Sequence, residues 1–334
     1  MKISTVIRTV GSLAVADLFV RARTQKRSYI PKELRLPFTL FRSPSFSNAL
    51  LPVVRILNLI QDHPVTDVSV RTTVITSEMG VSNKALIYRP LGVKPNGPVF
   101  MYIHGGGTFG GAPQILQNRV SAYARDLDMV AVAIQYRLSP MNPYPAPLDD
   151  AYAAYHWIRN NAAELDIDPA RVIVFGESAG GLIAAGLTHR LLDTGDPMPV
   201  FQVLSQPMLD DRTTLKPKPR YRGQIAWTPK SNRYGWTSYL GRRPQHSQPE
   251  SWATPARRKD LAGLPPAWIG VGTLDLFHDE DAAYAERLNA AGVPCQFLEV
   301  TGGYHGFDTL KVTSIGKSYR DSFITAARRA VNHA

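Results

Sequence analysis

Cysteine and long apolar runs are both nearly absent from this chain of 334 residues. Its one cysteine, Cys295, has no partner for an internal disulfide, so nothing indicates a disulfide-stabilised secreted scaffold. No run of about 18 apolar residues occurs, and the sequence therefore predicts no membrane-spanning helix. Charged residues make up only 19% of the chain and apolar residues 44%, which excludes a disordered polyelectrolyte and provides for a large core.

The first 20 residues carry a weak signal that has two interpretations. Lys2 and Arg8 precede a partly apolar segment in which residues 14–16 resemble a signal-peptide cleavage site. Five apolar residues instead recur on one face of a helix: Ile3, Ile7, Val10, Ala14 and Leu18. We therefore expect an amphipathic helix and a cytoplasmic protein, with secretion by a weak N-terminal signal as the alternative.

Positive charge is concentrated in one segment. The formal net charge is +11, and residues 212–259 contain twelve lysines and arginines against one acid, Glu250. We call this segment the basic insert; the rest of the chain is neutral. It is either a solvated loop or a surface for an anionic substrate, an acidic carrier protein or a membrane. Nucleic acid is not an expected partner, because no helix-turn-helix, zinc-ligand set or RNA-binding signature accompanies the charge.

Short apolar runs alternate with helix-forming segments along most of the chain. Eight runs are strand-like, at residues 65–75, 85–88, 99–103, 130–134, 172–175, 200–204, 267–271 and 295–300. Helices are expected at 149–163, 179–192, 280–291 and 318–331. The alternation predicts an α/β fold with a mostly parallel eight-stranded sheet and helices on both faces. Because no helix separates the first two strands, they should form an antiparallel edge.

This alternation lapses between residues 207 and 262, which are rich in Pro, Arg and Trp. Such a segment is too long for a plain connection in a compact domain, so we expect a lid or cap. Four aromatic residues should line it or pack it against the body: Trp227, Tyr234, Trp236 and Tyr239. The expected core then has two parts, residues 61–206 and 263–334, preceded by a largely helical segment, residues 1–60.

A serine occupies a sharp predicted turn in "VFGESAGG", residues 174–181. A buried strand ends before Ser178 and a helix begins after it. Gly176 and Gly180 remove Cβ atoms that would clash there, as in the G-x-S-x-G nucleophile elbow. The elbow would present Ser178 at the end of the sheet, above a helix N-terminus that favours a developing anion. Taken alone, the pentapeptide also fits a glycine-rich packing turn or a phosphate loop.

Three consecutive glycines, Gly105, Gly106 and Gly107, follow the strand expected at 99–103. Without side chains, their N–H groups can turn toward one point and hold an oxyanion. No Gly-Lys-Ser/Thr follows, which argues against a phosphate loop. We expect an oxyanion hole from these glycines and the amide of Ala179. Which two glycine amides point inward stays open, with Gly106 the favoured one.

Chain order selects the base that a serine nucleophile needs. In an elbow architecture the order is Ser, then Asp or Glu, then His, which excludes histidines before Ser178. Three later ones are poorly placed: His189 in an expected helix, His246 in the basic insert and His333 at the C-terminus. Of the remaining two, His278 and His305, we favour His305. It lies in the glycine-flanked loop "GGYHGF" directly after a strand, where an imidazole can be exposed.

The acid should lie in the segment after residue 271. Asp279 and its acidic neighbours enter the first turn of a helix, where acids commonly complement the helix dipole. Asp275 lies earlier, in the loop at the strand end, and is favoured over Asp279. The predicted chemistry is attack of Ser178 on an acyl carbon, with His305 moving the proton and Asp275 fixing the imidazole tautomer.

These motifs together resemble the bacterial hormone-sensitive-lipase-like carboxylesterases of the α/β-hydrolase fold. The likeness covers roughly residues 85–310. It rests on "HGGG" (104–107), "YRLSP" (136–140), "YPAPLDDAYAAYHW" (144–157), "GESAG" (176–180), "LPPAWIGVGTLDLFHDE" (264–280) and "HGF" (305–307). Two features depart from the family pattern: Leu276-Phe277 stands where Pro-Leu is frequent, and the insert is unusually basic.

The resemblance implies hydrolysis of esters with small to medium acyl groups, without metal or organic cofactor. It implies Ser178, Asp275 and His305 as the triad and a cap built from residues 1–60 and 207–262, while His104 supports its loop. A thioesterase acting on an acidic carrier protein is the second hypothesis. A non-catalytic binding module is the third, and His305 argues against it. The oligomeric state stays open, a homodimer included.

Overall fold

The computed structural model describes residues 29–40, 43, 45–77, 80–217, 221–245, 247, 252–309 and 313–333. Its strands are β1 (Val68–Thr76), β2 (Ser82–Pro90), β3 (Gly97–Ile103), β4 (Val130–Ile134), β5 (Ile167–Glu177), β6 (Phe201–Ser205), β7 (Ala267–Gly272) and β8 (Cys295–Val300). Its α-helices are α2 (Leu51–Leu57), α3 (Gln117–Leu127), α4 (Ala146–Asn160), α5 (Ala162–Leu165), α6 (Ala179–Thr194), α7 (Pro229–Leu240), α8 (His278–Ala290) and α9 (Ser314–Asn332). Short 3₁₀ helices span Lys32–Leu34, Pro37–Leu40, Asn48–Leu50, Pro113–Leu116, Asp211–Thr214, Pro255–Arg257 and Phe307–Thr309.

The predicted eight-stranded, mostly parallel sheet is confirmed. The strand order is β1-β2-β4-β3-β5-β6-β7-β8. β1 pairs antiparallel with β2, as expected at this edge, and β2 also pairs antiparallel with β4. All other pairs are parallel, so the carboxyl ends of β3 to β8 lie at one rim of the sheet.

The strand sequences account for how far each strand of this sheet is buried. β4 reads VAVAI and all of its residues are buried, because helices cover both faces at the centre of a parallel sheet. β1 reads VSVRTTVIT, and only two of its nine residues are buried, since it is the edge strand. Polar and apolar residues alternate there as they do on a half-solvated strand.

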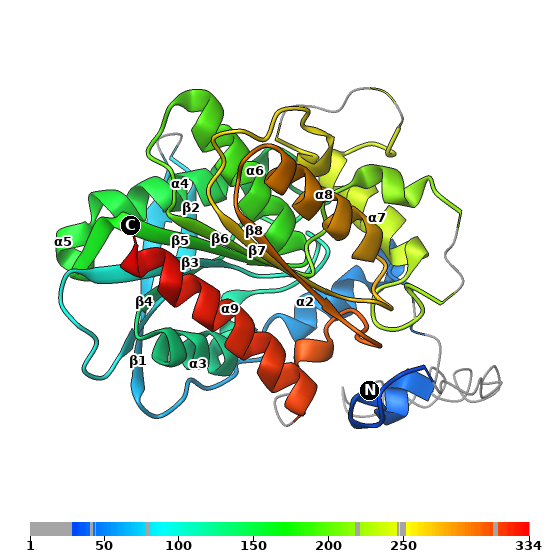
Figure 1. Ribbon diagram of the computed structural model, residues 1–334, viewed down its shortest axis with the longest axis horizontal. Coiled ribbons are helices and arrows are strands. Elements are labelled where there is room, and N and C mark those ends of the chain that lie inside the picture. Colours follow the sequence, from blue (N-terminus) through cyan, green and yellow to red (C-terminus); the bar gives the residue numbers. More distant parts are fainter. Residues whose placement is uncertain are drawn as a thin grey trace, which may run out of the picture.

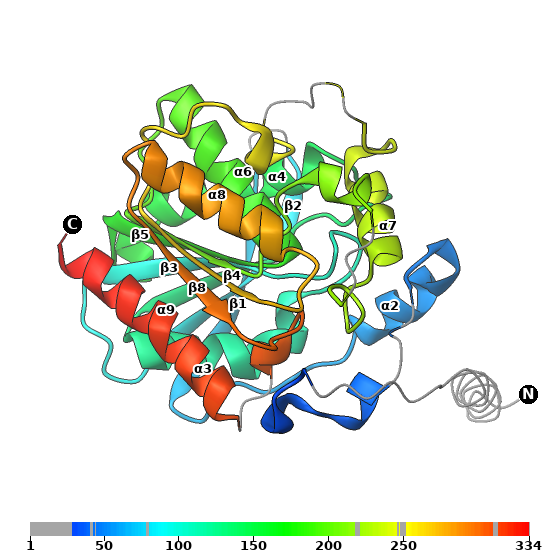
Figure 2. The same cartoon turned by 45° about the vertical axis from the view of Figure 1, so that its right-hand side comes forward.

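Helices form a layer on each face of the sheet (Figures 1 and 2). One face carries α3 and α9, over a core that includes Tyr123, Phe175 and Phe323. The other face carries α4, α6 and α8, over a core that includes Val174 and Ile183. This three-layer arrangement agrees with the α/β class and the helices on both faces that the sequence predicted.

One helix was missing from the sequence-based prediction, and two expectations were incomplete. α3 was not predicted. Its apolar residues recur at i, i+3, i+4 and i+7 (Val120, Tyr123, Ala124 and Leu127), all are buried, and this spacing is typical of an amphipathic helix. Residues 207–262 contain α7 as well as irregular structure. The described part of residues 1–60 contains only short helices, and the predicted amphipathic helix at residues 3–18 lies outside the described residues.

The segment before β1 and the basic insert contact each other at the carboxyl rim of the sheet. Ser45 Oγ lies 3.1 Å from Thr228 Oγ1, the Phe46 amide donates to Ser231 Oγ at 3.2 Å, and Tyr234 donates to Asn48 at 2.8 Å. α2 and α7 lie on the same side of the molecule in Figures 1 and 2. In the described part of the chain, no helix combines the length and apolar character needed to cross a bilayer.

Candidate active site

Ser178 sits at the turn between β5 and α6. Its backbone has φ +54° and ψ −117°, a strained conformation for a residue with a side chain. A Cβ on Gly176 would come within 2.2 Å of the Gly180 carbonyl oxygen, and one on Gly180 within 2.0 Å of the Ile103 carbonyl oxygen. Because neither carbonyl oxygen can move away without distorting the backbone, both positions require glycine. The predicted elbow geometry is therefore present at this position.

The structure brings Ser178, His305 and Asp275 together at the carboxyl rim. His305 follows β8 and its Nε2 lies 2.9 Å from Ser178 Oγ. Its Nδ1 lies 2.7 Å from Oδ2 of Asp275, which follows β7. With the proton on Nδ1, the imidazole donates to the carboxylate and accepts the serine hydroxyl hydrogen. We call these three residues the Ser-His-Asp array.

Asp275 is fully buried, and its second oxygen accepts a hydrogen bond from the Phe277 amide at 3.0 Å. Burial opposes a charge on His305, but the Asp275 carboxylate beside it prevails and raises the pKa of His305 above its ordinary value. The array therefore stabilises a proton on the imidazole.

The competing residues lie elsewhere. His278 Nδ1 contacts Asp279 at 3.0 Å and its Nε2 contacts Glu299, so both ring nitrogens are occupied. Asp279, with a side chain 68% exposed, pairs with Arg222 and His278. The structure thus joins the favoured base and acid, and neither alternative, to Ser178.

The glycine loop after β3 lies directly beside the elbow. A Cβ on Gly105 would stand 3.2 Å from Ser178 Cβ, and Gly106 and Gly107 have φ of +121° and +64°. Among the described residues, the backbone amides of Gly106, Gly107 and Ala179 have no hydrogen-bond acceptor. These amides are available to a ligand oxygen near Ser178.

His104, which precedes this loop, has a supporting position. It is fully buried, its Nδ1 lies 2.8 Å from the Gly105 carbonyl oxygen, and its ring stacks on Tyr136 at 4.3 Å. Burial lowers the pKa of His104 to about 4, so the ring is neutral at physiological pH. His189, in α6, is also buried and contacts the Tyr284 hydroxyl at 2.8 Å.

Aromatic side chains pack close to His305 of the array. The ring centroids of Trp227 and Phe277 lie 6.1 and 5.2 Å from that of His305. Trp227 also lies against Gly107, where a Cβ would come within 2.4 Å of the indole. Trp236 and Tyr239, both in α7, are fully buried in one cluster with Ala179 and Leu182 of α6. Of the four predicted aromatics, Trp227 therefore comes nearest to the array.

Several arginines of the basic insert are engaged in ion pairs. Four ion pairs join its arginines to acids outside the insert: Arg212–Asp210, Arg222–Asp279, Arg257–Asp211 and Arg258–Asp193. Three other cations, Lys216, Lys230 and Arg233, line a cavity of about 460 Å³ together with Leu276. The insert is thus partly neutralised by the fold, which reduces the positive surface that its sequence predicted.

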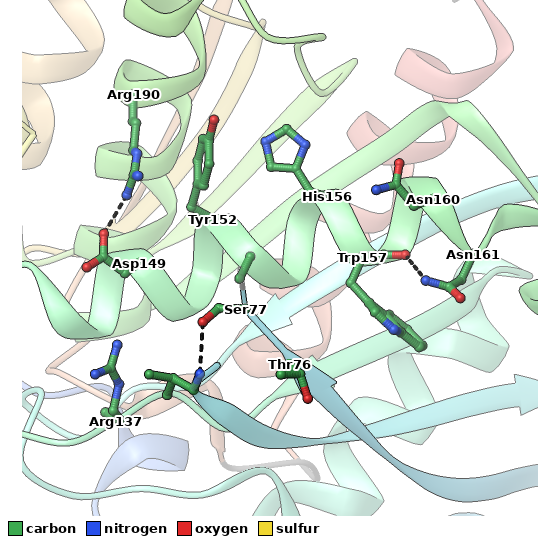
Figure 3. A pocket seen from close by; sticks show the side chains of 12 residues that line it. Thr76, Ser77, Arg137, Asp149, Tyr152, His156, Trp157, Asn160, Asn161 and Arg190 are labelled. Carbon is green, nitrogen blue, oxygen red and sulfur yellow. Dashed lines mark hydrogen bonds and ion pairs between the residues drawn. The ribbon is translucent and has the colours of Figure 1, made fainter. Parts of the chain in front are cut away.

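A second cavity, of about 350 Å³, lies beside α4 and is lined by none of the Ser-His-Asp array. Figure 3 shows Tyr152 and His156 on this helix and the ion pair between Arg190 and Asp149 at one end of the pocket. Because it contains no nucleophile in contact with a base, we do not assign the reaction to it. In the described residues, no three His, Cys, Asp or Glu side chains are grouped closely enough to hold a metal ion.

Asp281, in the first turn of α8, is fully buried, and neither of its carboxyl oxygens has a hydrogen-bond partner in the described part of the chain. Burial, and to a smaller extent the nearby Glu280 and Asp275, raise its pKa well above the usual value. A carboxyl whose folded pKa is raised contributes stability at acidic pH that is lost as the pH rises.

Asp281→Asn should therefore stabilise the protein more at pH 8 than at pH 5. We expect a rise in Tm of about 2–4 °C at pH 8, measured by calorimetry. Asp321→Asn is the control, because the Asp321 side chain is 55% exposed and has little desolvation cost to relieve, so it should bring no such gain. An equal or larger gain for Asp281→Asn at pH 5 would contradict this explanation.

Comparison with known proteins identifies the family of the chain. Residues 100–309 match a family model described as the alpha/beta hydrolase fold. Carboxylesterase NlhH of Mycobacterium tuberculosis is 36% identical over 227 residues, 66% of this chain and 70% of that protein. Esterase LipI of the same species is 35% identical over 210 residues, 63% of this chain and 65% of LipI.

Solved esterase structures are also similar over nearly their whole length. A structure described as bacterial heroin esterase has a TM-score of 0.81 and 29% identity, and the match covers 92% of this chain and 99% of that one. Esterase LipW from Mycobacterium marinum has a TM-score of 0.78 at 29% identity, with 92% and 98% covered.

Three charged residues near the array were not identified from the sequence: Arg119, Glu177 and Asp308. Glu177 lies inside the elbow motif and Asp308 three residues after His305, but no pattern indicated that Arg119 would contact both. Arg119 belongs to α3, the helix that the sequence-based prediction lacked.

Proposed function

Because this chain belongs to the bacterial hormone-sensitive-lipase-like carboxylesterases of the α/β-hydrolase fold, and so hydrolyses carboxylic esters, we propose that Ser178, His305 and Asp275 perform the reaction. The observation that carries the proposal is the unbroken hydrogen-bonded path from Ser178 Oγ through the imidazole to Asp275, with distances of 2.9 and 2.7 Å.

In the first half of the reaction, Ser178 Oγ attacks the ester carbonyl carbon while His305 Nε2 accepts the hydroxyl proton. The carbonyl oxygen becomes an anion, which the amides of Ala179 and of the glycine loop stabilise. When this intermediate collapses, His305 returns the proton to the departing alcohol oxygen. The acyl group then remains on Ser178 as an ester.

Water completes the cycle. His305 Nε2 accepts a proton from a water molecule as its oxygen attacks the acyl carbon, and then donates that proton to Ser178 Oγ as the carboxylic acid leaves. Asp275 keeps the Nδ1 tautomer throughout and stabilises the imidazolium that forms twice in each turnover.

The proposed substrates are esters of small to medium acyl groups. Trp227 and Phe277 pack close to His305, which limits the volume beside the reacting carbon. We further propose that the segment before β1 and residues 207–262 form a cap, a role that their mutual hydrogen bonds support. Docking of an acidic carrier protein stays a prediction, and the paired arginines of the insert do not favour it.

The test uses a panel of p-nitrophenyl esters from two to twelve carbons, with a matched thioester and an ester of an anionic acyl group, each at two salt concentrations. Short and medium esters should be cleaved fastest, and a fluorophosphonate should label Ser178 and abolish turnover. Labelling of a different residue would overturn the assignment. A preference for the thioester that disappears in high salt would instead support the carrier-protein hypothesis.

The pH profile provides a separate prediction. Only neutral His305 can accept the serine proton, so kcat/KM should fall as the pH drops through the pKa of His305 in the free enzyme. Asp275 raises that pKa, and the midpoint of the acid limb should lie above 6.5. The measurement is kcat/KM for p-nitrophenyl acetate from pH 5 to 9, with active sites titrated at each pH. A midpoint below 6.5 would contradict the charge stabilisation by Asp275.

A further inference from the structure

Behind the elbow, buried polar side chains hold the residue that precedes Ser178. Glu177 lies at the end of β5, and its Oε2 accepts a hydrogen bond from Nη1 of Arg119 in α3 at 2.8 Å. Tyr123, one turn further along α3, donates its hydroxyl to the other oxygen of Glu177 at 3.3 Å. The elbow is therefore anchored to α3 by a charged and a neutral hydrogen bond.

The same arginine leads to the loop that carries His305. Arg119 Nη1 lies 3.5 Å from Oδ2 of Asp308. Oδ1 of Asp308 accepts a hydrogen bond from Gln206 Nε2 at 2.7 Å, and the side-chain Oε1 of Gln206 accepts one from the Gly306 amide at 2.6 Å. Gly306 follows His305 directly, so the path ends at the neighbour of the base.

We call Arg119, Glu177, Gln206 and Asp308 the buried bracket. They come from four separate places in the fold: α3, the end of β5, the loop after β6 and the 3₁₀ helix after β8. The three side chains other than Arg119 belong to residues that are 8% exposed or less, and the side chain of Arg119 is 13% exposed.

Stability alone does not account for such a cluster. Burying two carboxylates and one guanidinium carries a desolvation cost, and apolar residues of similar volume are often at least as stabilising. Four polar side chains in fixed orientation do, however, define the relative position of two loops more sharply than apolar contacts. The bracket connects Glu177, which precedes Ser178, to Gly306, which follows His305. The proton moves between Ser178 and His305.

We propose that the buried bracket is a positioning device for the reaction, which fixes the His305 loop relative to the Ser178 elbow and keeps net negative charge behind the imidazole. The inference rests on the proposed function of the Ser-His-Asp array. It assigns to Arg119, Glu177, Gln206 and Asp308 a role that acts through Ser178 and His305 without contact with substrate.

The charges around His305 fit this role. The charged groups that face the imidazole or its bracket are Asp275 after β7, Glu177 at the end of β5, Asp308 after β8, Arg119 in α3 and Arg320 in α9, whose Nη1 donates to the Asp308 carbonyl oxygen. After Asp275, the next charges that favour the imidazolium are those of Asp308 and Glu177. Within the bracket, one guanidinium faces two carboxylates, so their formal charges leave a net negative charge.

Two variants separate the geometric part of the proposal from the electrostatic part. Gln206→Met breaks the connection to Gly306 without changing any charge, and kcat should fall about 10- to 100-fold with KM within about threefold of wild type. The nearly isosteric Asp308→Asn removes one negative charge, and the acid limb of the kcat/KM profile should move to lower pH. All rates are expressed per active site, titrated with a fluorophosphonate, so that a smaller folded fraction does not count as slower chemistry.

The matched control is Arg125→Met, which removes an exposed arginine from the same helix α3 and should leave both readouts unchanged. Arg119→Lys should retain more activity than Arg119→Met, because lysine preserves the charge. Wild-type kcat in Gln206→Met, or an unmoved acid limb in Asp308→Asn, would overturn the proposal. Failure of the wild type to react with the fluorophosphonate would instead count against the proposed function.

Discussion

Replacing Ser178 with alanine is expected to reduce kcat for p-nitrophenyl butyrate about 10⁶-fold, the loss that removal of a triad nucleophile brings. Without Oγ no acyl-enzyme can form, and His305 is left without the hydroxyl that lies 2.9 Å from its Nε2. The remaining rate comes from the oxyanion amides and from binding, which still act on a water molecule. Steady-state kinetics and the loss of fluorophosphonate labelling provide two independent readouts.

Ser318→Ala is the matched control, because this serine is exposed on α9 and is not part of the Ser-His-Asp array. It should leave kcat and labelling unchanged. Melting curves of both variants show whether the fold is intact. A folded Ser178→Ala variant with more than about one hundredth of the wild-type rate would require a different nucleophile and would remove the basis of the mechanism.

Asp275→Asn is expected to lower kcat about 10⁴-fold while the fold stays intact. The carboxylate accepts hydrogen bonds from His305 Nδ1 and from the Phe277 amide, one on each oxygen. An asparagine that keeps the bond to Phe277 turns its NH₂ group toward Nδ1. The imidazole must then carry its proton on Nε2, where it can no longer accept one from Ser178.

Asp279→Asn provides a direct comparison, since Asp279 was the competing candidate for the acid. Its side chain is mostly exposed and contacts His278 and Arg222, so the substitution should change kcat by no more than about threefold. A larger loss for Asp279→Asn than for Asp275→Asn would reverse the assignment of the acid.

The residues behind these predictions differ in how clearly the linear sequence identifies them. Gly176, Ser178 and Gly180 lie within five residues, and the local geometry of an elbow is fixed by local sterics. The glycine loop is local in the same way. His305 and Asp275 lie 127 and 97 positions from Ser178, and chain order and placement after strands narrowed the choice without fixing a distance. The parallel sheet brings all three to one rim, because the carboxyl ends of its strands meet there.

The helix assignments show where sequence patterns were too weak. α3 has the apolar spacing of an amphipathic helix, but the sequence-based prediction did not assign it. The basic insert shows a limit of charge counting, since its sequence contains one acid while four of its arginines pair with acids outside it. Charge counted along a segment does not include acids that the fold brings to it.

The sequence by itself determined the α/β class, the nucleophile elbow, the glycine loop and the best candidates for base and acid. Each depends on residues that are close in the chain, or on the order of motifs along it, and such features can be read without coordinates. Only the tertiary structure decided which carboxylate meets His305, that Trp227 lies over the glycine loop, and that Arg119 joins Glu177 to Asp308. Those contacts join residues 30 to 189 positions apart, and their distances depend on how the helices and strands pack, which no local pattern encodes.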